Sequence, residues 1–105
     1  MPDLSQLFQL GQQVQGRLMQ MQTELAQRTV TGSAGGGMVV VTADGRGQVQ
    51  SVKIDPSVAA TGDVEMLEDL VVAAVSDAQR KAEELYRGEL KKLTGGMSLP
   101  FQFPI

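Results

Sequence analysis

The chain of 105 residues contains no cysteine, no histidine and no tryptophan. Without cysteine, neither a disulfide framework nor a thiolate metal site can form. Without histidine or cysteine, the usual pairs of nucleophile and base are missing, and Ser33, Ser57 and Ser76 have no adjacent lysine to act as a base. Glu83 and Glu84 are neighbours on a predicted helix and therefore point in different directions. We expect a protein that is not an enzyme and uses no cofactor or metal.

Long apolar runs are also missing. The longest, Leu70–Val75, is far too short to cross a membrane. Met1–Leu10 lacks the basic start and continuous apolar stretch of a secretory signal. We expect a soluble, cytoplasmic protein with a single domain over residues 1–105. Its last part, residues 94–105, is a Pro- and Phe-containing tail that either docks on a groove or remains mobile.

Charged residues are unevenly distributed along the chain. The formal net charge is −3, which alone argues mildly against a nucleic-acid partner because phosphate binding is mainly electrostatic. Every ionised side chain in residues 61–79 is acidic, whereas residues 80–92 carry five basic side chains against three acidic ones. The chain is therefore locally positive near its C-terminal end.

The first helix is predicted by a seam of seven positions spaced alternately three and four residues apart. This spacing is typical of a long helix, from about Asp3 to Gln27, that packs against a partner helix. Such a helix is roughly 40 Å long. We therefore expect the chain to cover the exposed seam by self-association. Gly11 in the seam suggests a close helix crossing. The candidate dimer or packing seam is Leu4, Leu7, Val14, Leu18, Met21 and Leu25, and beside it lie Gln6, Gln9, Gln12, Gln13, Gln20 and Gln27.

Three β-strands are predicted after this helix. Arg28–Thr31 is short and β-favouring, and Gly32–Gly37 is interpreted as a flexible connection. Met38–Ala43 contains a valine run typical of a strand with both faces covered. Asp44-Gly45 predicts a hairpin turn. In the returning strand, Gln48–Ile54, the apolar residues depart from strict alternation, which predicts a bulge or partial burial on both faces.

A second long helix is predicted from about Asp63 to Leu93, after a loop at residues 58–62. Its acidic start and basic end suit the helix dipole. One side of it carries an apolar stripe, which is expected to face the sheet. The stripe is Val64, Leu67, Val71, Ala74, Ala78, Ala82 and Leu85.

Two segments that resemble ligand sites are better explained structurally. The Gly-rich segment lacks the lysine and the following helix of a phosphate-binding Walker loop. The acidic set near the start of the second helix lacks the spacing of a calcium-binding loop, and negative charge is favourable there. That set is Asp63, Glu65, Glu68 and Asp69.

Several segments resemble the YbaB/EbfC family of bacterial nucleoid-associated proteins. One is Val49-Gln-Ser-Val-Lys-Ile-Asp-Pro-Ser57, and a second is Glu65-Met-Leu-Glu-Asp-Leu-Val-Val-Ala-Ala-Val-Ser-Asp-Ala78. The triplet Val30–Gly32 before the Gly-rich segment, the Gln- and Met-rich first helix and Gly96–Pro100 in the tail are similar too. The resemblance covers nearly the whole chain in the right order.

This resemblance implies an α+β fold with a long N-terminal helix, a three-stranded antiparallel sheet and a long C-terminal helix, assembled as a tweezer-shaped homodimer. It also implies binding of double-stranded DNA with limited sequence preference, a change in DNA conformation, and a role in nucleoid organisation and gene regulation. Members of the family have no known catalytic activity or cofactor. The expected partners are DNA and a second copy of the chain, with no membrane or small-molecule substrate, and the expected location is the nucleoid.

The family offers no compact DNA-reading motif, so candidate contacts rest on charge and geometry. Basic side chains bind phosphates, and glutamines hydrogen-bond phosphate oxygens or base edges without adding charge. From the residues alone, the acidic total favours a salt-bridged exposed face for the cations of the second helix, with pairs such as Arg80–Glu84, over contact with phosphates. A protein–protein adaptor that docks through the first helix and the tail is the alternative function. The DNA-binding candidates are Gln9, Gln13, Arg17, Gln20, Arg28, Arg80, Lys81, Arg87, Lys91 and Lys92.

Overall fold

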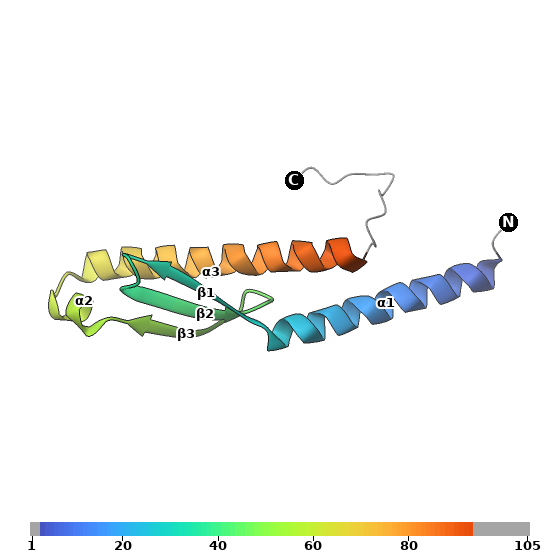
Figure 1. Cartoon of the computed structure of the whole chain (residues 1–105), viewed down its shortest axis with the longest axis horizontal. Coiled ribbons are helices and arrows are strands. Elements are labelled where there is room, and N and C mark those ends of the chain that lie inside the picture. The colour runs from blue at the N-terminus through green and yellow to red at the C-terminus, as the bar shows by residue number, and fades with distance from the viewer. Residues whose placement is uncertain (1–2, 94–105) are drawn as a thin grey trace.

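The computed structural model describes residues 3–93 of the chain. The expected order of helix, three strands and long helix is confirmed, with one additional short helix before the last (Figure 1). The predicted tail lies outside the described residues. The elements are α1 (Leu4–Gln27), β1 (Thr29–Ala34), β2 (Val39–Asp44), β3 (Val49–Ile54), α2 (Pro56–Ala60) and α3 (Val64–Leu93).

Helix α1 is anchored at its C-terminal end only. Met21 and Leu25 are buried, and the backbone of Gly45 in the β2–β3 turn donates to the carbonyl oxygen of Leu25 at 2.8 Å. By contrast, Leu4 is 78% exposed, and Leu7 and Val14 are also exposed. The predicted seam therefore splits into a buried end and an uncovered end. A Cβ on Gly11 would meet nothing within 4 Å, so within residues 3–93 this glycine makes no close helix crossing.

The sheet is antiparallel in the order β1-β2-β3. Strand β1 is longer than the sequence suggested, because Gly32, Ser33 and Ala34 pair with Val41, Val40 and Val39. The flexible connection predicted at 32–37 was therefore wrong for its first half. Only the second half forms the turn, where Gly35, Gly36 and Gly37 have positive φ values that favour glycine.

The hairpin at Asp44-Gly45 is confirmed, and a buried carboxylate holds it. The Asp44 Oδ1 atom accepts hydrogen bonds from the backbone N–H of Arg46 at 2.9 Å and of Gln48 at 3.0 Å. These bonds, that from Gln48 first, lower the pKa of Asp44. The predicted bulge is also present: Thr42 pairs with Ser51 and Ala43 with Val49, so Gln50 is the extra residue.

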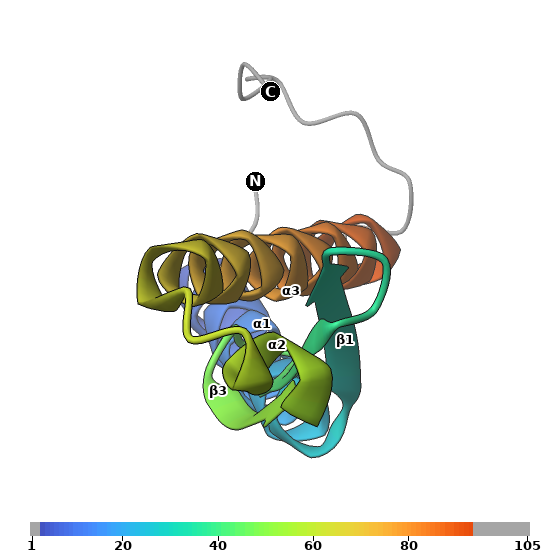
Figure 2. The same ribbon diagram turned by 90° about the vertical axis from the view of Figure 1, so that its left-hand side faces the viewer.

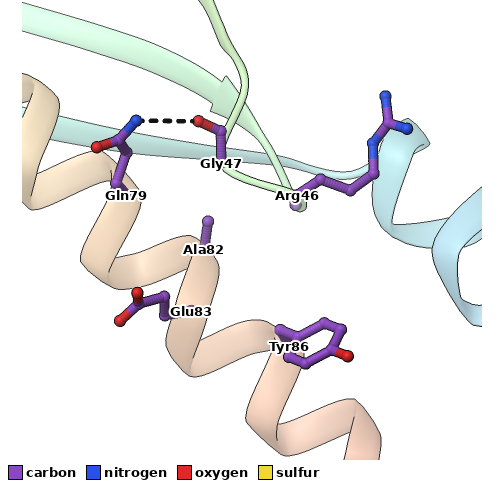
Figure 3. A pocket seen from close by; sticks show the side chains of 7 residues that line it. Arg46, Gly47, Gln79, Ala82, Glu83 and Tyr86 are labelled. Carbon is purple, nitrogen blue, oxygen red and sulfur yellow. Dashed lines mark hydrogen bonds between the residues drawn. The ribbon is translucent and has the colours of Figure 1, made fainter.

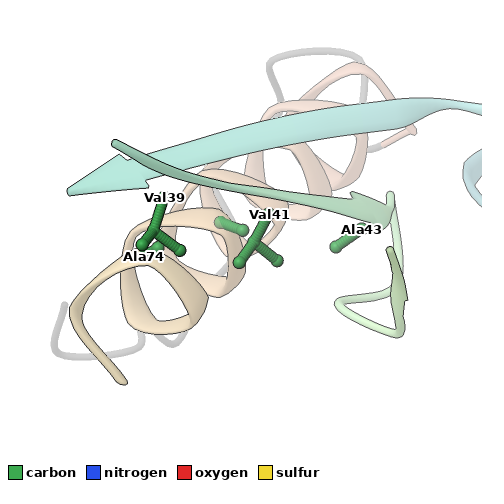
Figure 4. Close-up of a cluster of buried hydrophobic side chains, with 5 residues drawn as sticks. Val39, Val41, Ala43 and Ala74 are labelled. Carbon is green, nitrogen blue, oxygen red and sulfur yellow. The ribbon is translucent and has the colours of Figure 1, made fainter. Parts of the chain in front are cut away.

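The hydrophobic core lies between the sheet and α3 (Figure 4). Val39, Val41 and Ala43 project from β2 onto Ala74 and Ala78 of α3. The small alanines allow the helix to approach the sheet closely. Helix α3 packs mainly on β1 and β2, not on β3, and Figure 2 shows β1 beside α3 with β3 at the far side of the sheet. Val39 and Val41 are thus covered by α3, whereas Val40 lies on the opposite face of β2 and is only partly buried. The prediction that both faces of this strand are covered was therefore correct only for the face toward α3.

Both later helices begin at an aspartate cap. The Asp55 side chain accepts from the backbone N–H of Ser57 at 2.9 Å, with Pro56 in the first turn of α2. This cap turns most of the predicted loop at 58–62 into a short helix. Asp63 accepts from the backbone N–H of Met66 at 3.0 Å at the start of α3.

The molecule is elongated, with Cα extents of 69 × 26 × 17 Å. Helices α1 and α3 run in opposite directions, and α1 extends beyond the sheet as an arm (Figure 1). No helix in residues 3–93 is both long and apolar enough to span a membrane.

Candidate nucleic-acid interface

A shallow groove runs between the second half of α1 and the last turns of α3. Its volume is about 290 Å³. The Arg28 guanidinium lies 2.9 Å from Glu89 Oε1, and Lys92 Nζ lies 3.5 Å from the same oxygen. Through Glu89, Arg28 at the end of α1 is therefore held against the last turns of α3. The groove is lined by Arg17, Gln20, Met21, Glu24, Glu89, Lys92 and Leu93.

Four of the predicted DNA-binding residues form one row on α1. Gln9, Gln13, Arg17 and Gln20 are spaced four, four and three residues apart, which puts them on one face of the helix. All four side chains are exposed. Arg17 and Gln20 border the groove, and the glutamines before them continue the row toward the free end of α1. This face is polar, almost uncharged and open.

The predicted cations Arg80 and Lys81 are engaged in a local network. Arg80 lies 2.7 Å from Asp77 and 3.1 Å from Glu84, as predicted for the latter pair. Lys81 lies 3.3 Å from Asp77 and donates to the carbonyl oxygen of Thr31 at 2.9 Å. The contact of Lys81 with β1 was not visible in the sequence pattern, because Thr31 lies 50 positions away along the chain.

Asp77 is the centre of this network. Its carboxylate accepts a hydrogen bond from the backbone N–H of Ser33 at 3.1 Å, in addition to the two cations. The bond from Ser33, followed by that from Arg80, lowers the pKa of Asp77 to about 2. The hydrogen bond with Asp77, followed by the charge of Glu84, raises the pKa of Arg80. Asp77 therefore stays ionised and keeps both cations beside the sheet.

The remaining cations of α3 do not all face the groove. At about 100° per residue, Arg80 and Arg87 lie on the side of α3 opposite the buried alanines, and Lys91 lies near them. Arg87 and Arg17 make no ion pair or hydrogen bond within residues 3–93. The structure thus places Arg17, Gln20 and Lys92 at the groove, with Arg28 paired to Glu89 of its lining. Arg87 and Lys91 lie on the outer side of α3.

Two cations outside the predicted set also reach the surface. Lys53 projects from β3 with no ion pair among the described residues, and Arg46 at the hairpin lies 3.4 Å from Asp44. The sequence signal for Lys53 was its position between Val52 and Ile54, which sets it on the other face of the strand.

A second cavity, of about 330 Å³, lies between the hairpin and α3 (Figure 3). The Gln79 amide donates to the carbonyl oxygen of Gly47 at 3.3 Å across it. Arg46 and Glu83 extend in different directions (Figure 3), so the cavity offers no convergent set of polar groups. Among the described residues, no group of three or more acidic side chains is arranged to hold a metal ion.

Known proteins that resemble this chain share one family and one kind of name. Residues 1–97 match the model of the YbaB/EbfC DNA-binding family. A nucleoid-associated protein of Gemmatimonas aurantiaca is 47% identical over 102 residues, covering 97% of this chain and 98% of that protein. One from Rhodococcus erythropolis is 50% identical over 96 residues, covering 91% of this chain and 86% of its own length.

The fold has a solved counterpart. The crystal structure of an uncharacterized protein from Helicobacter pylori matches with a TM-score of 0.81 at 26% identity, covering 90% of this chain and 100% of that one. It shares the arrangement of long helices around a small sheet. From the family match and the curated relatives, the chain belongs to the YbaB/EbfC DNA-binding family.

Proposed function

We propose that this protein binds double-stranded DNA in the nucleoid as a homodimer, with limited sequence preference, and alters the conformation of the DNA. In this way it contributes to nucleoid organisation and gene regulation. The names of its relatives support a nucleoid role. The observation that carries the proposal is the exposed Gln/Arg row of α1, which leads into a groove bordered by Arg17 and Lys92.

The chemistry of this surface suits a polyanion of variable sequence. Glutamine amides donate to phosphate oxygens without the desolvation cost of an ion, and unpaired arginines supply charge-assisted hydrogen bonds. Few side chains here have the rigid, convergent geometry that reads individual bases. Backbone contact without strong base discrimination follows, which supports limited sequence preference.

A homodimer would provide more positive charge than one chain and would cover exposed apolar side chains. The net charge is −3, and only a few cations face each arm, so a two-fold assembly doubles a weak positive surface. The uncovered Leu4, Leu7 and Val14 also indicate that the chain requires a partner. Two arms related by a two-fold axis can contact DNA about one or more helical turns apart, roughly 34 Å per turn.

The direct test is an electrophoretic shift of mixed-sequence duplexes at low salt. We expect micromolar protein to retard several unrelated duplexes to a similar extent, and unlabelled nonspecific DNA to compete for binding. Changes in DNA shape are measured by ring closure of short duplexes with and without protein. Strong preference for one duplex, or no retardation at about 50 mM salt, contradicts the proposal.

A protein–protein adaptor is a second candidate function, favoured by the exposed apolar side chains of α1. Leu4, Phe8 and Leu10 are 78%, 72% and 57% exposed, and such residues can dock in a groove of another protein. The discriminating experiment is affinity capture from nuclease-treated lysate. Stoichiometric protein partners that survive nuclease support the adaptor, whereas their loss with the DNA supports the nucleoid protein.

A further inference from the structure

Helix α1 carries an apolar strip that is uncovered within residues 3–93. Leu7, Leu10 and Val14, called here the α1 strip, are 54%, 57% and 46% exposed. At about 100° per residue, their side chains lie within roughly 60° of one another around the helix. Met21 lies on the same side, further along the helix, and is buried. The side of α1 that is buried near the sheet is therefore uncovered toward its free end.

The groove between α1 and α3 lies next to this strip along α1. Arg17 and Met21 line the groove from α1, and Glu89 and Leu93 line it from α3. Because the two helices run in opposite directions (Figure 1), the direction of α3 at Leu93 points along α1 toward its free end. The residues that follow Leu93 in the chain therefore start beside Arg17, roughly 15 Å from Leu7 along the helix.

The sequence after Leu93 alternates between apolar and other side chains. Prolines at 100 and 104 lack the N–H group of a helix and restrict the preceding residue, so the sequence predicts an extended segment. Alternate side chains of an extended chain point to the same side. Residues 97–105, called here the tail segment, lie outside the described residues, and the family match ends at residue 97. The apolar side chains that this alternation places together are Met97, Leu99, Phe101, Phe103 and Ile105.

The α1 strip and the tail segment match in charge. Residues 4–16 contain no acidic or basic side chain, and neither do residues 94–105. The strip favours an apolar, uncharged segment, because a charged group brought against it would lose hydration without gaining a partner. Gly11 lies beside the strip, and a Cβ there would meet nothing within 4 Å. An aromatic ring can therefore approach the helix backbone at this glycine.

The connection between the two segments is long enough and short enough. Residues 94–105 span up to about 40 Å when extended, which exceeds the roughly 15 Å from the groove to Leu7. A segment on so short a connection has an effective concentration on the order of millimolar. It is therefore favoured over the same segment of a second copy at micromolar concentration.

We propose that the tail segment docks on the α1 strip of its own chain, with its apolar side against Leu7, Leu10 and Val14. Helix and tail segment then cover each other along the projecting arm. The glutamine row, which includes Gln9 and Gln13, lies roughly a quarter turn around the helix from the strip. Docking therefore holds the arm in place and leaves the row exposed.

This docking does not depend on DNA binding or on the proposed homodimer. Leu7 and Val14 also belong to the predicted seam, so the tail segment and a second copy compete for them. Leu4 and Phe8 point to another side of α1 and stay available to a second copy. The docking and the homodimer can therefore be tested separately.

The test is paramagnetic broadening from a nitroxide on the tail segment. The chain has no cysteine, so Gln102→Cys provides a single attachment point on the side of the tail segment opposite its apolar side chains. The methyl signals of Leu7, Leu10 and Val14 should lose most of their intensity. The methyl signals of Val64, at the other end of the molecule (Figure 1), should stay sharp. Undiminished signals from the α1 strip overturn the proposal.

A mixed sample distinguishes docking within one chain from docking on a second copy. Nitroxide-labelled protein without isotopes is mixed with isotope-enriched protein that carries no nitroxide. Broadening of the α1 strip should then be absent, because the label and the observed methyl groups are on different chains. Broadening as strong as in the first sample shows that the tail segment docks on another copy, which overturns the proposal and leaves the homodimer standing.

Paired substitutions on α1 locate the docking surface. In the nitroxide-labelled chain, Leu10→Gln combined with Val14→Gln should restore the methyl signals of Leu7, since the tail segment loses its apolar contacts. Phe8→Gln combined with Met19→Gln is the matched control. Both of those side chains are exposed and lie on the other side of the helix, so Leu7 should stay broadened. Restoration by the control pair instead contradicts docking on the α1 strip.

Hydrogen exchange tests the same contact without a nitroxide. Phe101→Ser combined with Phe103→Ser should speed amide exchange of Leu10 and Val14 about tenfold, because a helix end without packing opens readily. Gln102→Ser is the control from the other side of the tail segment and should leave the rates unchanged. Equal exchange rates in both variants contradict the proposal.

Discussion

Gly32 is the residue at which the sheet and α3 come closest. A Cβ at this position would overlap the backbone of Ala78 and Ala74. Gly32→Ala should therefore lower the free energy of unfolding by about 1–3 kcal/mol through overpacking. Gly88→Ala is the control, because a Cβ there meets nothing within 4 Å and alanine favours the helix by up to about 1 kcal/mol. Urea unfolding followed by circular dichroism measures both, and equal stabilities would contradict this packing.

Asp77 makes stability depend on pH. Because its pKa falls from 3.8 to about 2 on folding, the unfolded chain binds its proton more tightly, so the ionised carboxylate stabilises the fold above about pH 4. That contribution is lost as the pH falls through about 2. The free energy of unfolding of Asp77→Asn should therefore depend less on pH between 4 and 2 than that of the wild type. Parallel pH profiles from urea titrations would show that the Ser33 and Arg80 contacts do not act on this carboxylate.

At the scale of elements, the cations of α1 and α3 differ in how they are paired. Arg17 has no ion pair within residues 3–93 and borders the groove, whereas Arg80 is held by Asp77 and Glu84. Arg17→Gln should weaken DNA binding about tenfold and reduce the magnitude of the salt slope by about 2, one per protomer. Arg80→Gln should change the slope less. The measurement is fluorescence anisotropy with a labelled duplex at several salt concentrations; the reverse order of effects would move the site to α3.

Most of the elements followed from periodicity and turn residues, whereas most of the predicted loop at 58–62 is part of α2. The alternating seam predicted α1, and Asp44-Gly45 predicted the hairpin. The broken alternation of β3 predicted a bulge or partial burial on both faces, and the structure has the bulge, at Gln50. What local pattern could not show was pairing at a distance. Gly32 belongs to β1 because β2 and the backbone of α3 lie against it, and no neighbour in the sequence reports that contact.

The candidate site was predictable in part for the same reason. The row of glutamines and Arg17 on one helical face follows from spacing alone. The engagement of Lys81 with Thr31, and of Arg28 with Glu89, depends on residues 50 and 61 positions apart. Charge counts along the sequence therefore overestimated how many cations are available to DNA.

At the scale of the whole molecule, the protein combines a small core with a projecting arm, α1. Within residues 3–93 the core cluster contains five buried residues, so we expect folding to be coupled to the proposed self-association. The midpoint of thermal unfolding should then rise with protein concentration, as it does when subunits stabilise one another by mass action. Scanning calorimetry over a hundredfold range of concentration measures this. A midpoint independent of concentration would indicate that the single chain is stable alone.

The most direct test of DNA binding by a dimer is a salt-dependent titration of duplex DNA combined with the mass of the complex in solution. If two cations of each protomer contact phosphates, the logarithm of the binding constant should fall with that of the salt concentration at a slope of about −4. The mass should correspond to protein copies in multiples of two for each bound site. Binding that is insensitive to salt, or one protein chain for each bound site, would contradict the account.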